Sequence, residues 1–267
     1  MRSFLPYLIG FTLVLGIWLG GFVWPKSQGY YSIIDLVKDR TNRAYSRPYD
    51  RDILRADLVA GGFRLGDAAF VRLFKRESRL ELWMAPQGGG GRFKLFRTYD
   101  ICKFSGELGP KLKEGDRQSP EGFYQVAASQ MNPNSRHHLS FNLAFPNVFD
   151  RAHERTGTFL MIHGGCSSIG CYAVTDEKVD EIYAIVEAAQ NRGQDEVPVH
   201  IFPFEMNDDM MDRFSEHRWA DFWRNLKTGY DLFERDKVPP VVGVCEQTYV
   251  FNEETKQAGC QLVAGWG

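Results

Sequence analysis

The sequence has no strong excess of charge of either sign, and this absence limits the classes of function that it suits. Its 32 Lys and Arg residues are balanced by 34 Asp and Glu residues, which gives a formal net charge of -2. We therefore expect no nucleic-acid partner and no strongly charged one. The 267 residues, of which 43% are hydrophobic, suit one globular domain with a small appendage.

Common motifs for phosphate, redox chemistry and zinc are also missing. The four glycines at 88–91 precede no Gly-Lys-Ser/Thr and no helix, so they predict a hairpin turn. Four residues separate Cys166 from Cys171, so there is no Cys-x-x-Cys redox pair. A structural zinc site needs a second ligand pair, and none is spaced suitably among the remaining histidines, His137, His138, His153 and His200. We expect no metal and no cofactor.

Charge is absent from a long stretch at the N-terminus. Residues 3–25, SFLPYLIGFTLVLGIWLGGFVWP, are uncharged and long enough to span a bilayer. No A-x-A-like site follows them, which favours an uncleaved anchor over a cleaved signal peptide. The basic residues after this stretch oppose a simple positive-inside orientation, so the side of the membrane stays open. We assign 1–25 to a transmembrane anchor or signal peptide and 26–62 to a linker or helical connector.

The remaining chain shows mostly strand patterns. AFVRLFK (69–75) and RLELWMA (79–85) read as strands, as does EVPVHIFPF (196–204). The clearest helix is 176–193, with Thr175 or Asp176 as its cap and Gly193 as its stop. An aromatic helical tail (207–227) precedes an irregular or short-stranded end. These patterns predict a β-rich α+β fold, with a main domain at 63–205 and a helical or irregular C-terminal extension at 206–267.

The stretch FLMIHGGCSSIGCYAVTD, residues 159–176, combines an imidazole, two thiols and glycines. His163 ends one predicted strand and Cys171 begins the next, so a glycine-rich turn can bring them face to face. An imidazole beside a thiol can take its proton and lower the thiol pKa below its free value of roughly 8.5. Gly170 leaves backbone N–H groups free for an oxyanion. Spacing alone equally allows a structural cysteine beside a core histidine.

This stretch resembles the active-site signature of the L,D-transpeptidase (YkuD-like) family. In that family a strand-borne His-Gly is followed by Ser-His-Gly-Cys, and this chain has IHGG and then SSIGC. The resemblance implies that Cys171 is the nucleophile and that His163 is the general acid/base. It further implies that the Gly164 carbonyl orients the imidazole, and Gly170 matches the glycine before the nucleophile. The N–H groups of Gly170 and Cys171 are the candidate oxyanion site.

Two departures from that signature resemble the YafK-like (DpaA-type) branch of the family. Ile169 replaces the histidine before Gly-Cys, and the intervening loop is shorter than usual. Further segments resemble the branch between about Leu65 and Lys227, among them ICKFSGELGPKLKEGDRQSPEGFY, NPNSRHHLSFNLAFPN and DRAHERTGTFLMIHGGC. The implied fold is a YkuD-like β-sandwich with one packed central helix and a helical C-terminal extension.

The resemblance also implies a reaction on peptidoglycan. Members of the family form an acyl-enzyme at the L-centre of meso-diaminopimelate in the stem peptide. The branch implies hydrolysis of the amide that links a lipoprotein to the wall. The alternatives are a transpeptidase that forms cross-links or attaches proteins, and a non-catalytic wall-binding module. We expect a periplasmic or envelope location, with residues 3–25 as an inner-membrane anchor or export signal.

Five further residues are candidate ligands of the substrate. Three basic residues just before the active-site strand suit carboxylates of the stem peptide: Arg151, His153 and Arg155. Two polar residues on a predicted strand suit the wall of the cleft: Ser140 and Asn142. His138 fits a loop surface better than a site.

The five cysteines are an odd number, which in an exported chain suggests pairs and one working thiol. Cys245 and Cys260 lie fifteen apart in a tail with little core of its own. Closing that loop stabilises the fold by on the order of 3 kcal/mol, so we predict this disulfide and a free Cys171. Cys102 and Cys166 stay open, because each also suits a buried small hydrophobe.

Overall fold

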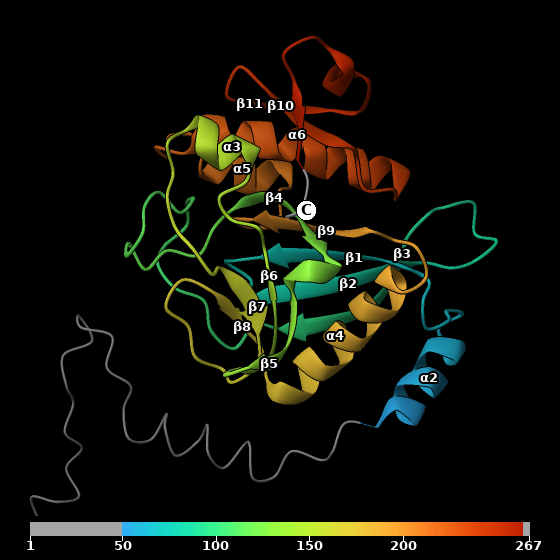
Figure 1. Ribbon diagram of the computed structural model, residues 1–267. Coiled ribbons are helices and arrows are strands. Elements are labelled where there is room, and N and C mark those ends of the chain that lie inside the picture. The colour runs from blue at the N-terminus through green and yellow to red at the C-terminus, as the bar shows by residue number, and fades with distance from the viewer. Residues whose placement is uncertain (1–49, 264–267) are drawn as a thin grey trace, which may run out of the picture. The chain divides into compact units, whose positions relative to one another are not determined.

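A five-stranded sheet lies at the centre of residues 50–263, the part of the chain that the computed structural model describes (Figure 1). Its order is β3-β2-β1-β9-β4, and its strands are β1 Ala68–Phe74, β2 Arg79–Ala85, β3 Lys94–Asp100, β4 Gly122–Ala127 and β9 Glu196–Phe202. β1 and β9 pair in parallel, and the other neighbours are antiparallel. The turn at 88–91 lies between β2 and antiparallel β3, which confirms the predicted hairpin.

Both faces of this sheet are covered, and β1 contributes to a core on each side. Val71 and Leu73 belong to a core that includes α4 (Asp176–Gln190). Phe74 belongs to a second core with α6 (Ala220–Asp236). The centroid of the Phe70 ring lies 4.7 Å from that of Phe233 in the same helix. The period-two alternation in the sequence therefore gives two apolar faces, each with its own cover.

The first core lies between the central sheet, α4 and a second sheet of order β5-β6-β7-β8. The strands of the second sheet are β5 Met131–Ser135, β6 His138–Asn142, β7 Met161–His163 and β8 Tyr172–Ala173. A short 3-10 helix, η2 (Ala128–Gln130), leads from β4 into β5. Leu54 and Leu58 of α2 (Arg51–Ala60) are buried in the same core.

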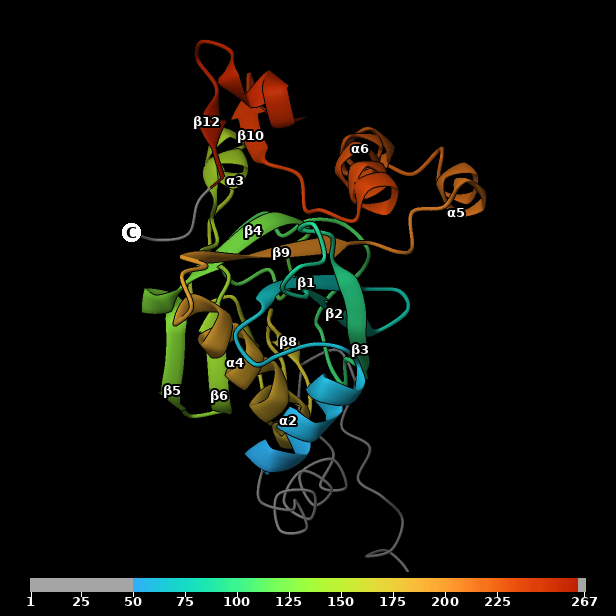
Figure 2. The ribbon, with the colours of Figure 1, turned by 90° about the vertical axis from the view of Figure 1, so that its right-hand side faces the viewer.

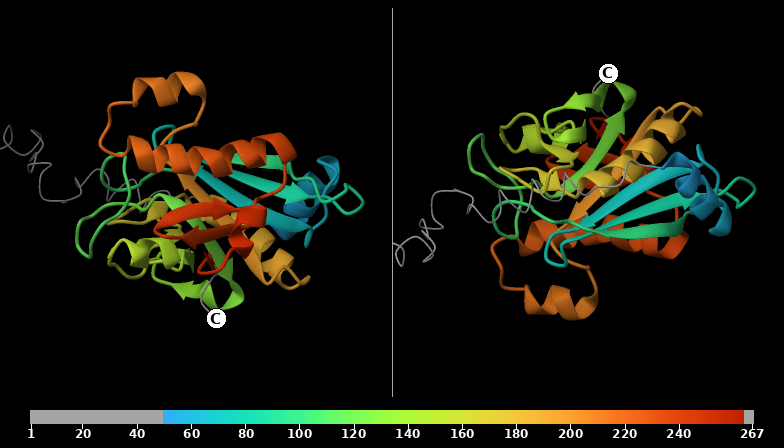
Figure 3. Two further views of the ribbon diagram at one scale, coloured as in Figure 1. Left: turned by 90° about the horizontal axis from the view of Figure 1, so that it is seen from above. Right: turned by 90° about the horizontal axis from the view of Figure 1, so that it is seen from below.

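The second core is largely aromatic and holds the C-terminal residues against the sheet. It contains Trp223 and Leu226 of α6 and Tyr249 of a three-stranded sheet in the order β11-β10-β12. That sheet comprises β10 Val242–Cys245, β11 Thr248–Phe251 and β12 Gln261–Leu262, with η3 Asn252–Lys256 between the last two. Figures 2 and 3 show α6 and this sheet side by side over one face of the central sheet. The shorter helices are α3 Val148–Ala152 and α5 Asp208–Arg213.

The predicted fold class is confirmed: the structure is a β-rich α+β fold with α4 packed between sheets and a C-terminal helix. The predicted cap of α4 is Thr175, whose hydroxyl accepts a hydrogen bond from the Lys178 amide at 3.4 Å. No helix within residues 50–263 is long and apolar enough to cross a membrane. The predicted anchor at 3–25 and most of the connector lie outside the described residues, and the domain boundaries stay predictions.

Candidate active site

Two short parallel strands hold the ends of the segment that carries the candidate nucleophile. β7 ends at His163 and β8 begins at Tyr172, and residues 164–171, hereafter the thiol loop, connect them. Parallel neighbours ordinarily need a connection of about a dozen residues or more, so this chain must double back sharply. Cys166 and Gly170 adopt left-handed backbone conformations within the loop, with φ of 45° and 114°. Gly170, directly before Cys171, therefore has a backbone conformation that other residues adopt only with strain.

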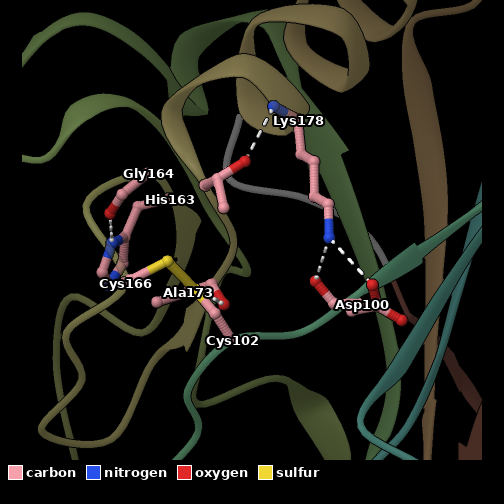
Figure 4. Close-up of a disulfide and its surroundings, with 8 residues drawn as sticks. Asp100, Cys102, His163, Gly164, Cys166, Ala173 and Lys178 are labelled. Carbon is pink, nitrogen blue, oxygen red and sulfur yellow. Dashed lines mark hydrogen bonds and ion pairs between the residues drawn. A yellow bond between two sulfur atoms is a disulfide. The ribbon is translucent and has the colours of Figure 1, made fainter. Parts of the chain in front are cut away.

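The orientation of the His163 imidazole is fixed by its own neighbour in the chain. His163 is 1% exposed, and its Nδ1 lies 2.6 Å from the Gly164 carbonyl oxygen (Figure 4). Because a carbonyl oxygen only accepts, Nδ1 carries the hydrogen and Nε2 is the nitrogen that can accept a proton. Burial lowers the pKa of His163 to about 4, outweighing the opposite effect of the Gly164 carbonyl. The imidazole is therefore neutral near pH 7, as a general base must be.

Gly164 occupies a position where a side chain does not fit. A Cβ there would lie 2.5 Å from Asp176 Oδ1, 2.9 Å from the His137 carbonyl oxygen and 3.0 Å from Val179 Cγ1. The first turn of α4 and the hairpin between β5 and β6 thus close on this residue from two sides. This crowding holds the peptide whose carbonyl orients His163.

Cys171 is the free cysteine of the described chain, and it is 8% exposed. Its Sγ donates a weak hydrogen bond to the Phe159 carbonyl oxygen at 3.5 Å, and no hydrogen bond to His163 occurs in this structure. Burial raises the pKa of the Cys171 thiol, while the Met161 N–H and the Lys111 ammonium lower it by less. The expectation of a thiol pKa below its free value is therefore wrong for this arrangement, because desolvation disfavours the thiolate.

The peptide unit of Cys171 is held by two hydroxyl groups. The Ser119 and Ser168 side chains donate to the Cys171 carbonyl oxygen at 2.9 and 2.7 Å. No hydrogen bond from the N–H groups of Gly170 and Cys171 to residues 50–263 occurs, so these amides suit an oxyanion. Ser105 bonds to both serines, since its N–H donates to Ser119 Oγ at 3.0 Å and its hydroxyl lies 2.9 Å from Ser168 Oγ.

A disulfide ties the thiol loop to the segment that follows β3. Cys102 and Cys166 are bonded, with Cα atoms 5.4 Å apart (Figure 4). Beside them, Lys103 and Ala173 form an antiparallel β-bridge. The second disulfide is Cys245–Cys260, so the prediction of that bond and of a free Cys171 is confirmed. The Cys102–Cys166 pairing resolves what the sequence left open.

The segment that carries Ser119 is anchored by a buried ion pair. Lys75 and Glu121 have no exposed surface, and Nζ lies 3.1 Å from Oε1. Lys75 also donates to the Gly109 carbonyl oxygen at 2.7 Å, and the Trp223 indole donates to Glu121 at 2.8 Å. Since Trp223 belongs to α6, this network connects the C-terminal helix to the segment whose serine holds Cys171.

The predicted cleft residues lie near His163 on the adjacent strand. Ser140 of β6 pairs with His163 in the antiparallel register, and Asn142 pairs with Met161. The Ser140 hydroxyl is buried and has no hydrogen-bond partner among the described residues. Ser140 therefore lies beside the imidazole, and its contact with substrate stays a prediction.

The three basic candidates lie in less favourable positions. Arg155 is buried, and its Nη1 forms an ion pair with Asp150 Oδ1 at 2.9 Å, so it is not free for a carboxylate. Arg151 lines a cavity of about 350 Å³ between α3 and the C-terminal sheet. His153 is exposed, and its Nε2 lies 2.8 Å from the Gln247 carbonyl oxygen. This geometry favours a structural role around α3 for these three residues over contact with substrate at Cys171. Their role as substrate ligands stays a prediction.

Residues that the sequence did not suggest also contact the site. The His137 ring lies 4.4 Å from the His163 ring, centroid to centroid, at an angle of 31°. Ser119 lies 52 residues before Cys171. Neither follows from local spacing, although both lie within segments that resemble the branch. Within residues 50–263 there is no cluster of His, Cys, Asp and Glu side chains that could hold a metal ion.

The fold and this site define a class: an α+β protein in which an oriented imidazole ends one of two paired parallel strands and a free thiol lies directly before the other. No protein-family model matches the chain. The chain is 45% identical over 189 residues to YafK of Escherichia coli, strains K12 and O157:H7, a candidate L,D-transpeptidase. The match covers 71% of this chain and 76% of YafK. The chain belongs to the L,D-transpeptidase family.

Two solved structures share only a distant likeness with the chain. Pgp2 of Campylobacter jejuni, a helical cell shape determining protein, is 19% identical over 70% of this chain, with a TM-score of 0.42. The match spans 64% of Pgp2, less than two thirds of its length. Bd1075 of Bdellovibrio bacteriovorus is 18% identical over 62% of this chain and 60% of its own, with a TM-score of 0.36. Neither likeness bears on function.

Proposed function

We propose that the protein is a cysteine enzyme that cleaves peptidoglycan-linked amides, with Cys171 as nucleophile and His163 as general acid and base. The observation that carries the proposal is the oriented imidazole. The Gly164 carbonyl fixes its tautomer at 2.6 Å, on a strand paired with the one that Cys171 precedes. Family membership at 45% identity to YafK supports peptidoglycan as the substrate.

The proposed acylation begins with a neutral thiol and a neutral imidazole. Since burial raises the pKa of Cys171 and lowers that of His163, the thiol proton moves to Nε2 as sulfur attacks, not before. The carbonyl attacked is the one at the L-centre of meso-diaminopimelate. The N–H groups of Gly170 and Cys171 stabilise the oxyanion, and His163 returns its proton to the leaving amine.

The acyl-enzyme then passes its acyl group to an acceptor, and we propose that the acceptor is water. His163 takes a proton from water, hydroxide attacks the thioester, and the Cys171 thiol is released with a free carboxylate on the product. The short thiol loop, and the resemblance of the sequence motifs to the YafK-like branch, support hydrolysis of the amide between a lipoprotein and the stem peptide. An amine acceptor gives a transpeptidase instead, the alternative that the family name favours.

We also propose an envelope location, with residues 3–25 as an inner-membrane anchor or export signal. Disulfides persist in oxidising compartments, and Cys102–Cys166 and Cys245–Cys260 support such a compartment. Peptidoglycan lies outside the inner membrane, so the substrate requires the same side. The test is a topology reporter fused after Gly267; activity of that reporter only in the cytoplasm would overturn the location.

The reaction is tested by incubating the protein with purified sacculi, from a strain with a wall-linked lipoprotein, in water enriched in oxygen-18. The Cys171→Ala variant is the matched control. Hydrolysis releases lipoprotein and gives one heavy oxygen on the diaminopimelate carboxyl, seen by mass spectrometry of the muropeptides. Incorporation of an added amine without heavy oxygen would instead establish transpeptidation.

A non-catalytic wall-binding module gives neither product. It is distinguished by the thiol itself, because a purely structural Cys171 resists alkylation in the folded protein. Binding to sacculi without release, together with an unreactive thiol, would reject the enzyme proposal.

A further inference from the structure

The ring of His137 packs against the proposed base. Its centroid lies 4.4 Å from that of His163, and the two planes differ by 31°. The two rings are tilted relative to each other, at a separation close to that of favourable aromatic pairs. The ring makes no hydrogen bond to another residue in the described part of the chain, where only the His137 backbone N–H is bonded, to Ser135 Oγ at 3.1 Å. The interactions of this ring within residues 50–263 are therefore its contact with the His163 ring and its electrostatic effect on His163.

The turn that carries His137 is itself tied to the site. β5 and β6 form a hairpin in which Ser135 pairs with His138, so His137 lies in a tight turn between them (Figure 2). The N–H of Gly164 donates to the Leu139 carbonyl oxygen at 3.2 Å. The Asp176 carboxylate, from α4, and the His137 carbonyl oxygen, from the turn, both lie close to Gly164. The position of the His137 ring is therefore fixed relative to the peptide that orients His163.

We propose that His137 is a positioning residue whose ring forms a wall against His163, holding the imidazole in one orientation and shielding one of its faces from water. The inference rests on the proposed function, in which His163 is the base. Ile169 leaves no imidazole in the thiol loop itself, and its side chain is 73% exposed. The second ring at the site thus comes from another element, the β5–β6 hairpin.

The test separates the ring from its ionisable nitrogens. His137→Ala removes the wall, whereas His137→Phe keeps a flat ring of similar size. His138→Ala is the matched control, because the neighbouring His138 is exposed and contacts Asp180 at 2.7 Å instead of His163. All three variants are first compared with wild type by circular dichroism, so that an unfolded variant is recognised.

The first readout does not depend on the reaction. The titration of His163 is followed by NMR of the imidazole carbons. In wild type the pKa of His163 is low, about 4, chiefly because of burial, and in His137→Phe it stays low apart from a small rise caused by the loss of the repulsion from His137. In His137→Ala water reaches the ring, and the pKa rises toward its ordinary value of roughly 6.5. A pKa unchanged in His137→Ala overturns the proposal.

The second readout is turnover on sacculi. His137→Ala lowers kcat by on the order of 10-fold with KM little changed, since orientation of the base is lost. His137→Phe and His138→Ala stay within about twofold of wild type. Equal losses in the Phe and Ala variants overturn the positioning role of the ring. If wild type shows no turnover, the proposed function fails, and the NMR titration still decides the role of His137.

Discussion

Ser119 donates a hydrogen bond from its hydroxyl to the Cys171 carbonyl oxygen at 2.9 Å, across 52 residues of sequence. Ser168 donates to the same oxygen at 2.7 Å. The peptide that contains this carbonyl follows the candidate nucleophile directly. The two hydroxyls therefore fix the backbone that also sets the direction of the Cys171 side chain and N–H.

Ser119→Ala should lower kcat by about 10-fold, because the hydroxyl loses its hydrogen bonds to the Cys171 carbonyl oxygen and from the Ser105 N–H, each worth about 1 kcal/mol, and the peptide of Cys171 is freed to tilt. The measurement is product formation from sacculi under saturating conditions. Ser215→Ala is the control, since Ser215 is exposed and bonds only within its own segment, to the Asp212 carbonyl oxygen. Equal activity in both variants would show that the serine contact does not position the nucleophile.

The two disulfides should differ in their effect on activity. Cys102→Ala with Cys166→Ala frees the thiol loop, whereas Cys245→Ala with Cys260→Ala opens a loop in the C-terminal sheet. In the loop-entropy model the first pair, 64 residues apart, stabilises the fold by about 4 kcal/mol, and the second, 15 apart, by about 3 kcal/mol.

Both double variants should therefore melt at lower temperature, while only the first should lose most of its turnover at a temperature where both are folded. Calorimetry gives the stability, and the sacculus assay gives the activity. A first variant that is folded and fully active would mean that the disulfide stabilises the loop without placing Cys171.

Local spacing brought the candidate residues together, and only the resemblance to the family motif assigned their roles, which stay predictions. His163 and Cys171 stand eight residues apart in a motif, and the cap and apolar face of α4 lie within one helix. Cys245 and Cys260 were predictable for the same reason, since a short loop in a small tail leaves few other partners. Each of these inferences depends on residues that are close in sequence.

The features that sequence did not predict are long-range contacts. Cys102 meets Cys166 across 64 residues, and Ser119 meets Cys171 because Lys75 and Glu121 anchor its segment beneath α6. The contact between the His137 and His163 rings depends on the register of β5, β6 and β7, which single-residue patterns do not specify. Desolvation of the thiol likewise depends on the packed structure.

Removal of the base should slow the chemistry of the thiol. In His163→Ala, turnover should fall by several orders of magnitude, and alkylation of Cys171 at pH 7 should slow, because no group accepts the thiol proton. Iodoacetamide labelling followed by intact mass measures the alkylation rate in protein with both disulfides formed. An alkylation rate that is identical in wild type and variant from pH 6 to 9 would show that the imidazole does not affect the reactivity of the thiol.

Burial of His163 should also make stability depend on pH within a defined window. Its pKa in the folded protein is about 4, against 6.5 for an unperturbed imidazole. Above pH 6.5 both the folded and the unfolded state hold it neutral, so it contributes no pH dependence. Between pH 6.5 and 4 the unfolded chain binds a proton that the folded state excludes, so the free energy of unfolding decreases as pH falls.

The magnitude follows from the two pKa values and is isolated by a variant without the imidazole. Between pH 7.5 and 4.5, His163 should account for a loss of about 2.5 kcal/mol in the free energy of unfolding. Urea unfolding of wild type and His163→Gln at both pH values measures it, and the carboxylates and the buried His200 contribute equally to both proteins. Wild type should lose more stability than the variant by that amount. An equal loss of unfolding free energy in the two proteins would mean that folded His163 accepts a proton as readily as a solvated imidazole. The imidazole would then be partly charged near neutral pH instead of being available as a base.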